Sequence, residues 1–238
     1  MTPRFVARQL AHLTGLLGLV IPLLTNRRIV ARQLAHPTGL LGRVMALLMN
    51  RRNAQMNALA VRQLALSGTD RVLEIGFGGG PILQTLLANA AFVAGVDRSP
   101  DMVARAKAHH ARAVDEGRAE FRAGEVEAIP FEAESFDKIC TLNTVYFWRS
   151  LDEGAGEIAR VLVPGGRAVI GFLPKMHMDR LGVPLDIFTP RTPDEVIAAL
   201  TRAGFREVRA EQPSSWKVIM LMAAKAEAKE TGAASRLV

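Results

Sequence analysis

A glycine-rich turn and two carboxylates carry the clearest chemical signal in this sequence. Glu74 and three glycines, Gly76, Gly78 and Gly80, follow a short apolar run and precede a helical pattern. Glycines at such a point let the backbone turn sharply and approach a ligand closely. Asp97 closes the next apolar run, 17 residues after Gly80, where a carboxylate can accept hydrogen bonds from both hydroxyls of a ribose. The pattern predicts a nucleoside-type ligand.

The position of Glu74 narrows the kind of nucleoside. A carboxylate inside the turn would repel a pyrophosphate, whereas it suits the ammonium group of a methionine moiety. The turn from Glu74 to Gly80 also contains no Lys or Arg, and a cationic sulfonium donor without phosphates needs no basic cradle. We therefore favour a sulfonium nucleoside, and an NAD(P)-dependent oxidoreductase remains the alternative of another class.

Hydrophobic periodicity indicates which elements position these residues. It predicts strands over 71–75, 92–96, 119–122, 136–142, 167–172, 205–210 and 217–224. It predicts helices over 29–49 with an interruption near 37–39, and over 54–66, 81–89, 100–114, 152–162 and 192–203. Strands alternating with helices indicate a doubly wound parallel sheet. The last two strands are joined only by a loop, so we expect them to pair antiparallel.

Local signals define two helix starts and one helix end. Ser99 is the expected N-cap of the helix over 100–114, and Thr192 with Glu195 forms the pattern of a capping box. The Pro-Gly-Gly run at 164–166 is expected to close the helix over 152–162, before the next strand begins at Arg167.

Five segments, taken together, are typical of one known family. VLEIGFGGG (72–80), GVDRSPDMV (95–103), GEVEAIPF (124–131), FDKICTLNTVYFW (136–148) and LVPGGR (162–167) resemble, in order and spacing, the motifs of class I S-adenosylmethionine-dependent methyltransferases. The resemblance covers about residues 55–224. It implies an α/β, Rossmann-like fold, doubly wound, with a seven-stranded, mostly parallel sheet whose last strand is antiparallel, preceded here by N-terminal helices. It also implies S-adenosyl-L-methionine as methyl donor, S-adenosyl-L-homocysteine as product, and no metal.

The resemblance assigns ten residues to the cofactor. The three glycines of the turn would pass beneath it, Glu74 would hold its amino end through water, and Asp97 would bind the ribose. The remaining assignments are Arg98 and Ser99 flanking the adenine, Glu125 at the adenine amino group, Val126 against the ring, and Asn143 at the methionine end. For Glu125 a solvated loop charge is the alternative, and for Arg98 a surface residue.

Three aromatic residues just after the fourth strand, Tyr146, Phe147 and Trp148, are the candidate acceptor pocket. Such rings shape an apolar pocket, hold a cation, or simply pack locally. Methyl transfer from a sulfonium depends mainly on alignment, and a base is needed only if the acceptor must lose a proton. Tyr146 and His177 are the catalytic candidates, with a surface loop position as the alternative for His177. Asn143 and Tyr146 have the spacing of a motif of amino-methylating enzymes, but its two prolines are absent.

The N-terminus is a tandem duplication. Residues 4–28 and 28–52 are identical at 19 of 25 aligned positions. We divide the chain into this duplicated basic and apolar segment (1–52), a methyltransferase domain (53–224) and a flexible tail (225–238). The apolar run of each copy is too short to span a bilayer. We expect the second copy to be a helix packed on the domain, closing the pocket or forming a homodimer, and membrane-surface contact remains open.

Charge and cysteine content limit the partners. Residues 1–52 contain eight arginines and no acid, whereas the remainder has 22 basic and 23 acidic residues. The domain thus has no positive excess to bring it onto nucleic acid, and a small-molecule acceptor is favoured. The alternative is a macromolecule or lipid acceptor, with the basic N-terminus docking on RNA or a membrane. The single cysteine, Cys140, excludes an internal disulfide, fits a cytoplasmic setting, and is expected to be inert core.

Overall fold

The protein was analysed as a computed structural model, which describes residues 26–35, 38–39, 53–213 and 217–227. A seven-stranded sheet in the order β3-β2-β1-β4-β5-β7-β6 forms its centre. The strands are β1 (Arg71–Ile75), β2 (Phe92–Asp97), β3 (Ala119–Ala123), β4 (Phe136–Leu142), β5 (Leu162–Phe172), β6 (Phe205–Glu211) and β7 (Ile219–Lys225).

Strand directions follow the expected pattern. The neighbouring pairs among β1 to β5 are parallel. The last strand, β7, lies between β5 and β6 and is antiparallel to both. The central strands are buried on both faces, whereas the edge strand β6 carries exposed charged residues, which discourage pairing with another chain. The predicted α/β fold with a doubly wound sheet and an antiparallel last strand is confirmed.

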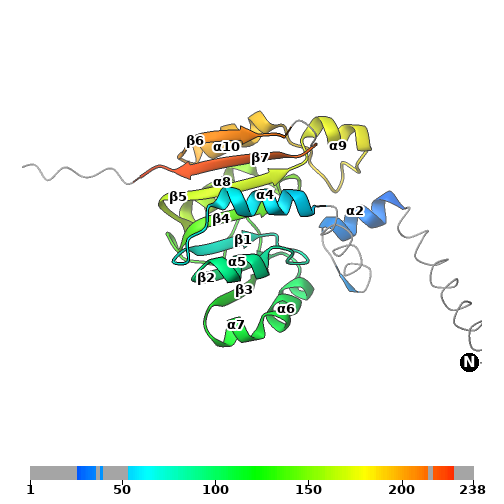
Figure 1. The fold of residues 1–238 in the computed structure, drawn as a ribbon. Helices are drawn as coiled ribbons and strands as arrows, with labels where there is room; N and C mark the ends of the chain where they lie inside the picture. Colours follow the sequence, from blue (N-terminus) through cyan, green and yellow to red (C-terminus); the bar gives the residue numbers. More distant parts are fainter. Residues whose placement is uncertain (1–25, 36–37, 40–52, 214–216, 228–238) are drawn as a thin grey trace, which may run out of the picture.

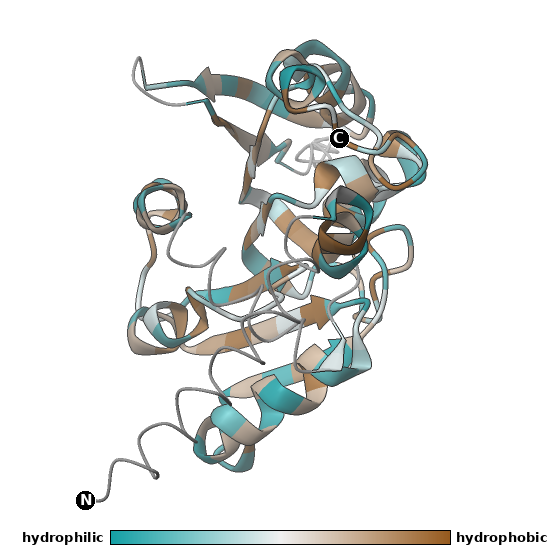
Figure 2. Cartoon of the chain, turned by 90° about the vertical axis from the view of Figure 1, so that its right-hand side faces the viewer, coloured by the Kyte–Doolittle hydropathy of each residue, from teal (hydrophilic) through white to brown (hydrophobic). Residues whose placement is uncertain are grey.

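Helices cover both faces of the sheet (Figure 1). They are α2 (Arg27–Ala35), α4 (Ala54–Leu64), α5 (Leu83–Asn89), α6 (Pro100–His109), α7 (Ala111–Asp115), α8 (Leu151–Val161), α9 (Lys175–Leu181) and α10 (Pro193–Arg202), with a 3₁₀ turn η1 (Val145–Phe147). One apolar core joins the sheet to α4, α5, α6 and α7, and the other joins it to α8, α10 and η1. In Figure 2 the strands are largely hydrophobic, and the helices mix hydrophobic and hydrophilic residues.

Several boundaries differ from the sequence-based expectation. The helix predicted over 100–114 is two helices, because the backbone of His110 leaves helical geometry (φ −111°, ψ 27°) while its ring packs on Phe121. Ser99 precedes α6 without a side-chain cap. Strand β5 begins at Leu162, so the Pro-Gly-Gly run lies inside the strand instead of before it. Within 174–190, where the periodicity predicts neither a helix nor a strand, the structure has the helix α9. The capping box of Thr192 and Glu195 is confirmed.

The N-terminal duplication is described only in part. Of the helix expected over 29–49, the structure describes α2 and residues 38–39, while the first copy and residues 40–52 lie outside the described residues. Ala31 of α2 is buried in the core shared with α8 and α10, and Leu34 packs against it. Among the described helices, none is long and apolar enough to cross a membrane.

The fold gathers chain segments at one edge of the sheet. The parallel strands β1 to β5 end at this edge, and the antiparallel strand β7 begins there, because Ile219 pairs with Phe172. Helices α2 and α9 lie beyond the same edge, on the right in Figure 1. In open α/β sheets, ligands bind outside the carboxyl ends of the strands, so this edge is where a site is expected.

Candidate functional site

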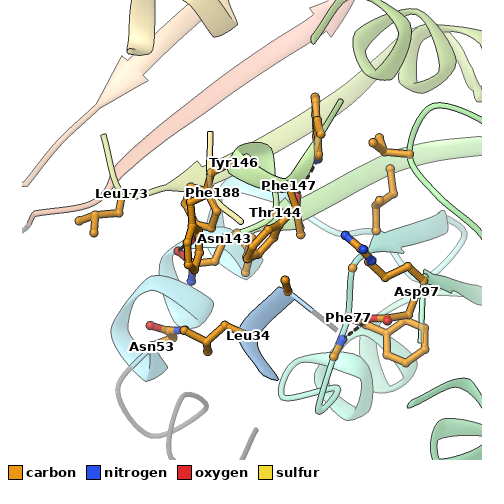
Figure 3. A pocket seen from close by; sticks show the side chains of 18 of the residues that line it. Leu34, Asn53, Phe77, Asp97, Asn143, Thr144, Tyr146, Phe147, Leu173 and Phe188 are labelled. Atoms are coloured by element: carbon orange, nitrogen blue, oxygen red, sulfur yellow. Dashed lines mark hydrogen bonds between the residues drawn. The ribbon is translucent and has the colours of Figure 1, made fainter. Parts of the chain in front are cut away.

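A cavity of about 750 Å³ lies at the carboxyl edge of the sheet. Figure 3 shows Asp97 and Phe77 on one side of it and Leu173, Phe188 and Tyr146 on the other. The strand order explains this division. Residues that follow β1, β2 and β3 line what we call the turn side, and residues that follow β5 or precede β7 line the α9 side. The segment after β4 lies between them.

The glycine-rich turn requires its first glycine for close approach. Gly76 has φ +69°, and a Cβ atom there would overlap the Cγ2 methyl of Thr144. Gly78 also has positive φ (+50°), but a Cβ there would meet no atom within 4 Å. The first glycine therefore lets the turn after β1 pack against the segment after β4, and the second leaves open space beside the cavity.

Glu74, the penultimate residue of β1, lines the cavity although it is only 3% exposed. Its Oε2 atom is buried without a hydrogen-bond partner among the described residues. Burial, and secondarily the nearby charge of Asp97, raises the pKa of this carboxyl well above 4.5. An unpartnered buried carboxyl is costly, so this atom is a candidate contact for a cationic ligand group.

Asp97 ends β2 and holds the turn in place. Its Oδ2 accepts a hydrogen bond from the backbone N–H of Gly78 at 2.7 Å, and its Oδ1 accepts one from Ser99 N–H at 2.9 Å. Both bonds orient the carboxylate at the cavity wall, where it is 5% exposed. A carboxylate has about four lone-pair sites, and this one lies at the cavity wall, where it can accept hydrogen bonds from ligand hydroxyls.

The segment after β3 carries Glu125, Val126 and Glu127 to the cavity. The Glu125 carboxylate forms an ion pair with Arg149 at 2.6 Å, and Glu127 accepts a hydrogen bond from the backbone N–H of Arg149 at 2.6 Å. Glu125 is thus tied to the segment after β4. Val126 is buried against the core.

Two residues of helix α8 form hydrogen bonds with the backbone of the segment after β3. Arg160 donates hydrogen bonds to the carbonyls of Ile129 and Phe131, while Glu157 accepts one from Ile129 N–H. The Arg160 guanidinium also lowers the pKa of Glu157.

A line of hydroxyl hydrogen bonds fixes the segment after β4. Thr141 donates from Oγ1 to the carbonyl of Ile75 at 3.0 Å, so its oxygen accepts from the Thr144 hydroxyl. The Thr144 oxygen in turn accepts from the indole N–H of Trp148 at 3.1 Å. Each donor in this line has one acceptor, so the hydrogen bonds connect the end of β1 to Trp148, the last of the three aromatic residues after β4.

Asn143 and Tyr146 form a pair at the cavity wall. Asn143 has φ +59°, and its Oδ1 accepts a hydrogen bond from the Tyr146 hydroxyl at 2.8 Å. Tyr146 is 7% exposed, and burial raises the pKa of its hydroxyl far above the ordinary value of 10. This geometry orients the Asn143 amide and makes a phenolate costly at neutral pH.

The three aromatic residues predicted as the acceptor pocket, Tyr146, Phe147 and Trp148, line the cavity, and a fourth ring joins them. Phe188, in the segment after α9, packs on Phe147 and Tyr146 with ring centroids 4.9 and 5.7 Å apart. Trp148 also lines the cavity, but it is buried, and a Cβ at Gly154 would overlap its ring. The rings of Tyr146, Phe147 and Phe188, which pack on one another, form what we call the aromatic wall of the cavity.

Most of the residues that the sequence singled out line the cavity, but they make up only part of its wall. The structure brings together Glu74, Gly76, Gly78, Asp97, Arg98, Glu125, Val126, Asn143, Tyr146, Phe147, Trp148 and His177. Gly80 and Ser99 do not line the cavity. His177, on α9, is half-buried at the wall. Thr144, Phe188 and Leu34 were missed, and of these only Phe188 had a signal, as the one aromatic residue of 174–190.

One further expectation concerns the single cysteine. Cys140 is fully buried in β4, and burial raises the pKa of its thiol well above 9.0, which keeps the thiol protonated as expected for inert core. Among the residues that the structure describes, no three His, Cys, Asp or Glu side chains are grouped to hold a metal ion.

Comparison with known proteins agrees with this geometry. Residues 73–170 match the family described as "Methyltransferase domain". The uncharacterized methyltransferase YdaC of Bacillus subtilis is 32% identical over 125 residues, 52% of this chain and 67% of that protein. The 27-O-demethylrifamycin SV methyltransferase of Amycolatopsis mediterranei is 32% identical over 109 residues, but the match covers 45% of this chain and only 40% of that protein.

A solved structure has the same fold. The N-methyltransferase NodS from Bradyrhizobium japonicum WM9, in complex with S-adenosyl-L-homocysteine, aligns with a TM-score of 0.61 at 20% identity, over 73% of this chain and 87% of that one. The sheet order, the glycine-rich turn with its two acids, and these similarities lead to one conclusion. The chain belongs to the class I S-adenosylmethionine-dependent methyltransferases, which are transferases.

Proposed function

We propose that the protein transfers a methyl group from S-adenosyl-L-methionine to a small-molecule acceptor, mainly by positioning the two reactants. The observation that carries this proposal is the buried Oε2 of Glu74, unpartnered among the described residues and beside Asp97 in the cavity wall. Within the described structure, no group pairs with this carboxyl oxygen. The ammonium group of the donor's methionine would supply the missing partner.

The other cavity residues of the turn side fit the same donor. Asp97 lies at the cavity wall, where it would accept hydrogen bonds from the ribose hydroxyls, and the open space at Gly78 leaves room for the nucleoside against the backbone. Glu125 and Val126 would meet the adenine edge and face. When bound, S-adenosyl-L-methionine supplies a methyl group already activated on a sulfonium. This chain has therefore to hold the acceptor atom in line and exclude water.

The segment after β4 and the α9 side suit a role in positioning the acceptor. The Asn143 amide is oriented by Tyr146 in the segment between the two sides of the cavity, where the methyl would be transferred. We assign Tyr146 a positioning role, because its proton is already donated to Asn143 and its pKa is raised. His177 is the candidate base for acceptors that must lose a proton.

A small-molecule acceptor is favoured by cavity size and by relatives. Drug-sized ligands occupy pockets of roughly 300–1,000 Å³, and about 750 Å³ must hold donor and acceptor together. The names of several relatives specify small acceptors, among them the rifamycin methyltransferase and a ubiquinone/menaquinone C-methyltransferase of Geotalea daltonii. Apart from YdaC, the relatives compared are matched over only 40 to 48% of their own length.

Calorimetry with S-adenosyl-L-homocysteine and with NAD tests the donor assignment. We expect the homocysteine nucleoside to bind and NAD to show no heat of binding. Asp97→Ala should weaken nucleoside binding about 100-fold, because up to two charge-assisted hydrogen bonds are lost. Asp97→Asn keeps an acceptor for Gly78 N–H and should cost about tenfold.

Asp194→Asn, at an exposed carboxylate on α10 outside the cavity, is the control and should bind normally. Binding of NAD in place of the nucleoside, or equal affinity in the wild type and Asp97→Ala, would overturn the proposal. Turnover is then measured as nucleoside product formed with a panel of small acceptors.

A further inference from the structure

Charge is divided across the cavity in a way that methyl transfer alone does not require. The turn side carries the four acids that line the cavity and one exposed cation, Arg98. The acids are Glu74, Asp97, Glu125 and Glu127, and Glu125 pairs with Arg149 of the segment after β4. The α9 side carries Arg180, Lys217 and the half-buried His177, and the described lining residues there include no acid. The sheet order keeps these groups apart, because β3, β2 and β1 lie on one side of β4, and β5 and β7 lie on the other.

The two cations of the α9 side have no polar partner among the described residues. Neither Arg180 nor Lys217 forms a hydrogen bond or ion pair with any described residue. The acids nearest to them along the chain have other partners, and for Lys217 this acid is Glu211, which accepts a hydrogen bond from Gln63. Asp179 pairs with Lys175 at 3.1 Å, Asp186 pairs with Arg28 at 3.8 Å, and neither lines the cavity.

Between these cations and the boundary with the turn side the wall is apolar. It consists of the rings of Tyr146, Phe147 and Phe188 together with Leu173, Met178 and Val183. Aromatic faces can hold a cation, but these rings pack on one another, and the charges beyond them are positive. The wall therefore favours an apolar body, and the cations disfavour a positively charged one.

We infer that the acceptor is an apolar or aromatic small molecule bearing a negatively charged group, which Arg180 and Lys217 bind while the apolar body lies along the aromatic wall. This inference rests on the proposed function, because it takes the α9 side to be the acceptor side. Both cations are exposed. The anionic group stays partly hydrated at the mouth of the cavity, and the apolar body is the part that is buried. The charge then lies far from Glu74 and Asp97, which would repel it.

Matched ligands separate charge from shape. Decanoate, decyl phosphate, 1-decanol and decylamine share one apolar chain, and 2-naphthoate, 2-naphthalenemethanol and 2-naphthylmethylamine share one ring. Each is titrated by calorimetry into the full chain saturated with S-adenosyl-L-homocysteine, at low and at high salt. We expect the anions to bind more tightly than the alcohols by about three- to fivefold or more, and the amines to bind more weakly than the alcohols. The advantage of the anions should shrink at high salt.

Variants identify the residues responsible. Arg180→Gln and Lys217→Gln should each weaken decanoate binding about three- to fivefold, and the double variant about tenfold, with 1-decanol affinity unchanged. Lys107→Gln removes an exposed cation of α6, outside the cavity, and should change neither affinity. S-adenosyl-L-homocysteine titration of each variant checks that it is folded.

The outcomes distinguish this inference from the proposal beneath it. The inference is wrong, and the proposed function stands, if the nucleoside binds but the alcohols bind as tightly as the anions. The same conclusion follows if the double variant loses affinity for decanoate and for 1-decanol to the same extent. If the nucleoside itself does not bind, the proposed function fails and the inference fails with it. If decyl phosphate is preferred over decanoate, the anionic group is a phosphate, and the reverse preference indicates a carboxylate.

Discussion

At the scale of single residues, burial makes the protonation of Glu74 a determinant of stability. A buried carboxyl is stabilised in its neutral form unless a cation lies beside it. Burial and Asp97 raise the folded-state pKa of Glu74 above its unfolded value near 4.5. The folded protein therefore holds a proton that the unfolded chain releases. Its stability falls as pH rises from about 4.5 toward the folded-state pKa. A bound ammonium group would lower the folded-state pKa of Glu74, because it favours the ionised carboxylate.

The first prediction follows from this loss of stability with rising pH. Glu74→Gln keeps the shape but cannot ionise, so it should raise the melting temperature of the unliganded protein at pH 8 by about 2 °C or more. At pH 4 it should have little effect. The same substitution should weaken S-adenosyl-L-homocysteine binding about tenfold, because it removes the charge that pairs with the ammonium.

Thermal unfolding at the two pH values and calorimetry measure these effects. Glu120→Gln, at a partly exposed carboxyl of β3 outside the cavity, is the control. A lower melting temperature at pH 8, or an unchanged affinity, would contradict this account of Glu74.

At the scale of elements, the site depends on how the turn after β1 meets the segment after β4. Because Gly76 has no Cβ, the methyl group of Thr144 can pack against its backbone. The hydroxyl of Thr144 forms hydrogen bonds with both Thr141 and Trp148. This contact sets the position of Asn143 relative to Glu74, and therefore of acceptor relative to donor. A misplacement of about 1 Å at such a point can cost about 100-fold in rate.

The second prediction uses the two glycines as matched positions. Gly76→Ala should cost about 2 to 4 kcal/mol of unfolding free energy, from overlap with Thr144 and from positive φ. Gly78→Ala has only the positive φ and should cost about 1 kcal/mol, while weakening nucleoside binding because its Cβ extends into the cavity region.

A compensating substitution separates overlap from backbone strain. Thr144→Ser removes the methyl but keeps the hydroxyl, so it should restore about 1 kcal/mol or more to Gly76→Ala and nothing to Gly78→Ala. Denaturant unfolding measures all six proteins: the wild type, the three single variants and the two double variants. Equal costs for the two glycine variants would show that the contact with Thr144 is unimportant.

At the scale of the whole molecule, the cavity exists only when the chain is folded. Its wall takes residues from α2, α4, the ends of β1 to β5, α9 and the start of β7, so the unfolded chain has no comparable site. Binding to the folded state alone raises stability by RT ln(1 + [L]/Kd).

The third prediction is therefore a thermal shift. S-adenosyl-L-homocysteine at about 100 times its Kd should add about 2.7 kcal/mol and raise the melting temperature by about 5 to 10 °C. NAD at the same concentration should produce no shift, and Asp97→Ala should lose most of the shift at that nucleoside concentration. A shift by NAD alone would point to a dinucleotide site instead.

The sequence by itself determined the order of strands and helices, the antiparallel last strand, and the turn from Glu74 with Asp97 across from it. These are local patterns combined with a general rule, since parallel strands end at one edge and bring their last residues together. Tertiary structure alone decided the break at His110, the early start of β5, the contact of Gly76 with Thr144, and the addition of Phe188 and Leu34 to the cavity. It also decided that Arg180 and Lys217 face the same space. Periodicity indicates which face of an element is apolar, but the partner of that face is fixed only by packing between segments far apart in the chain.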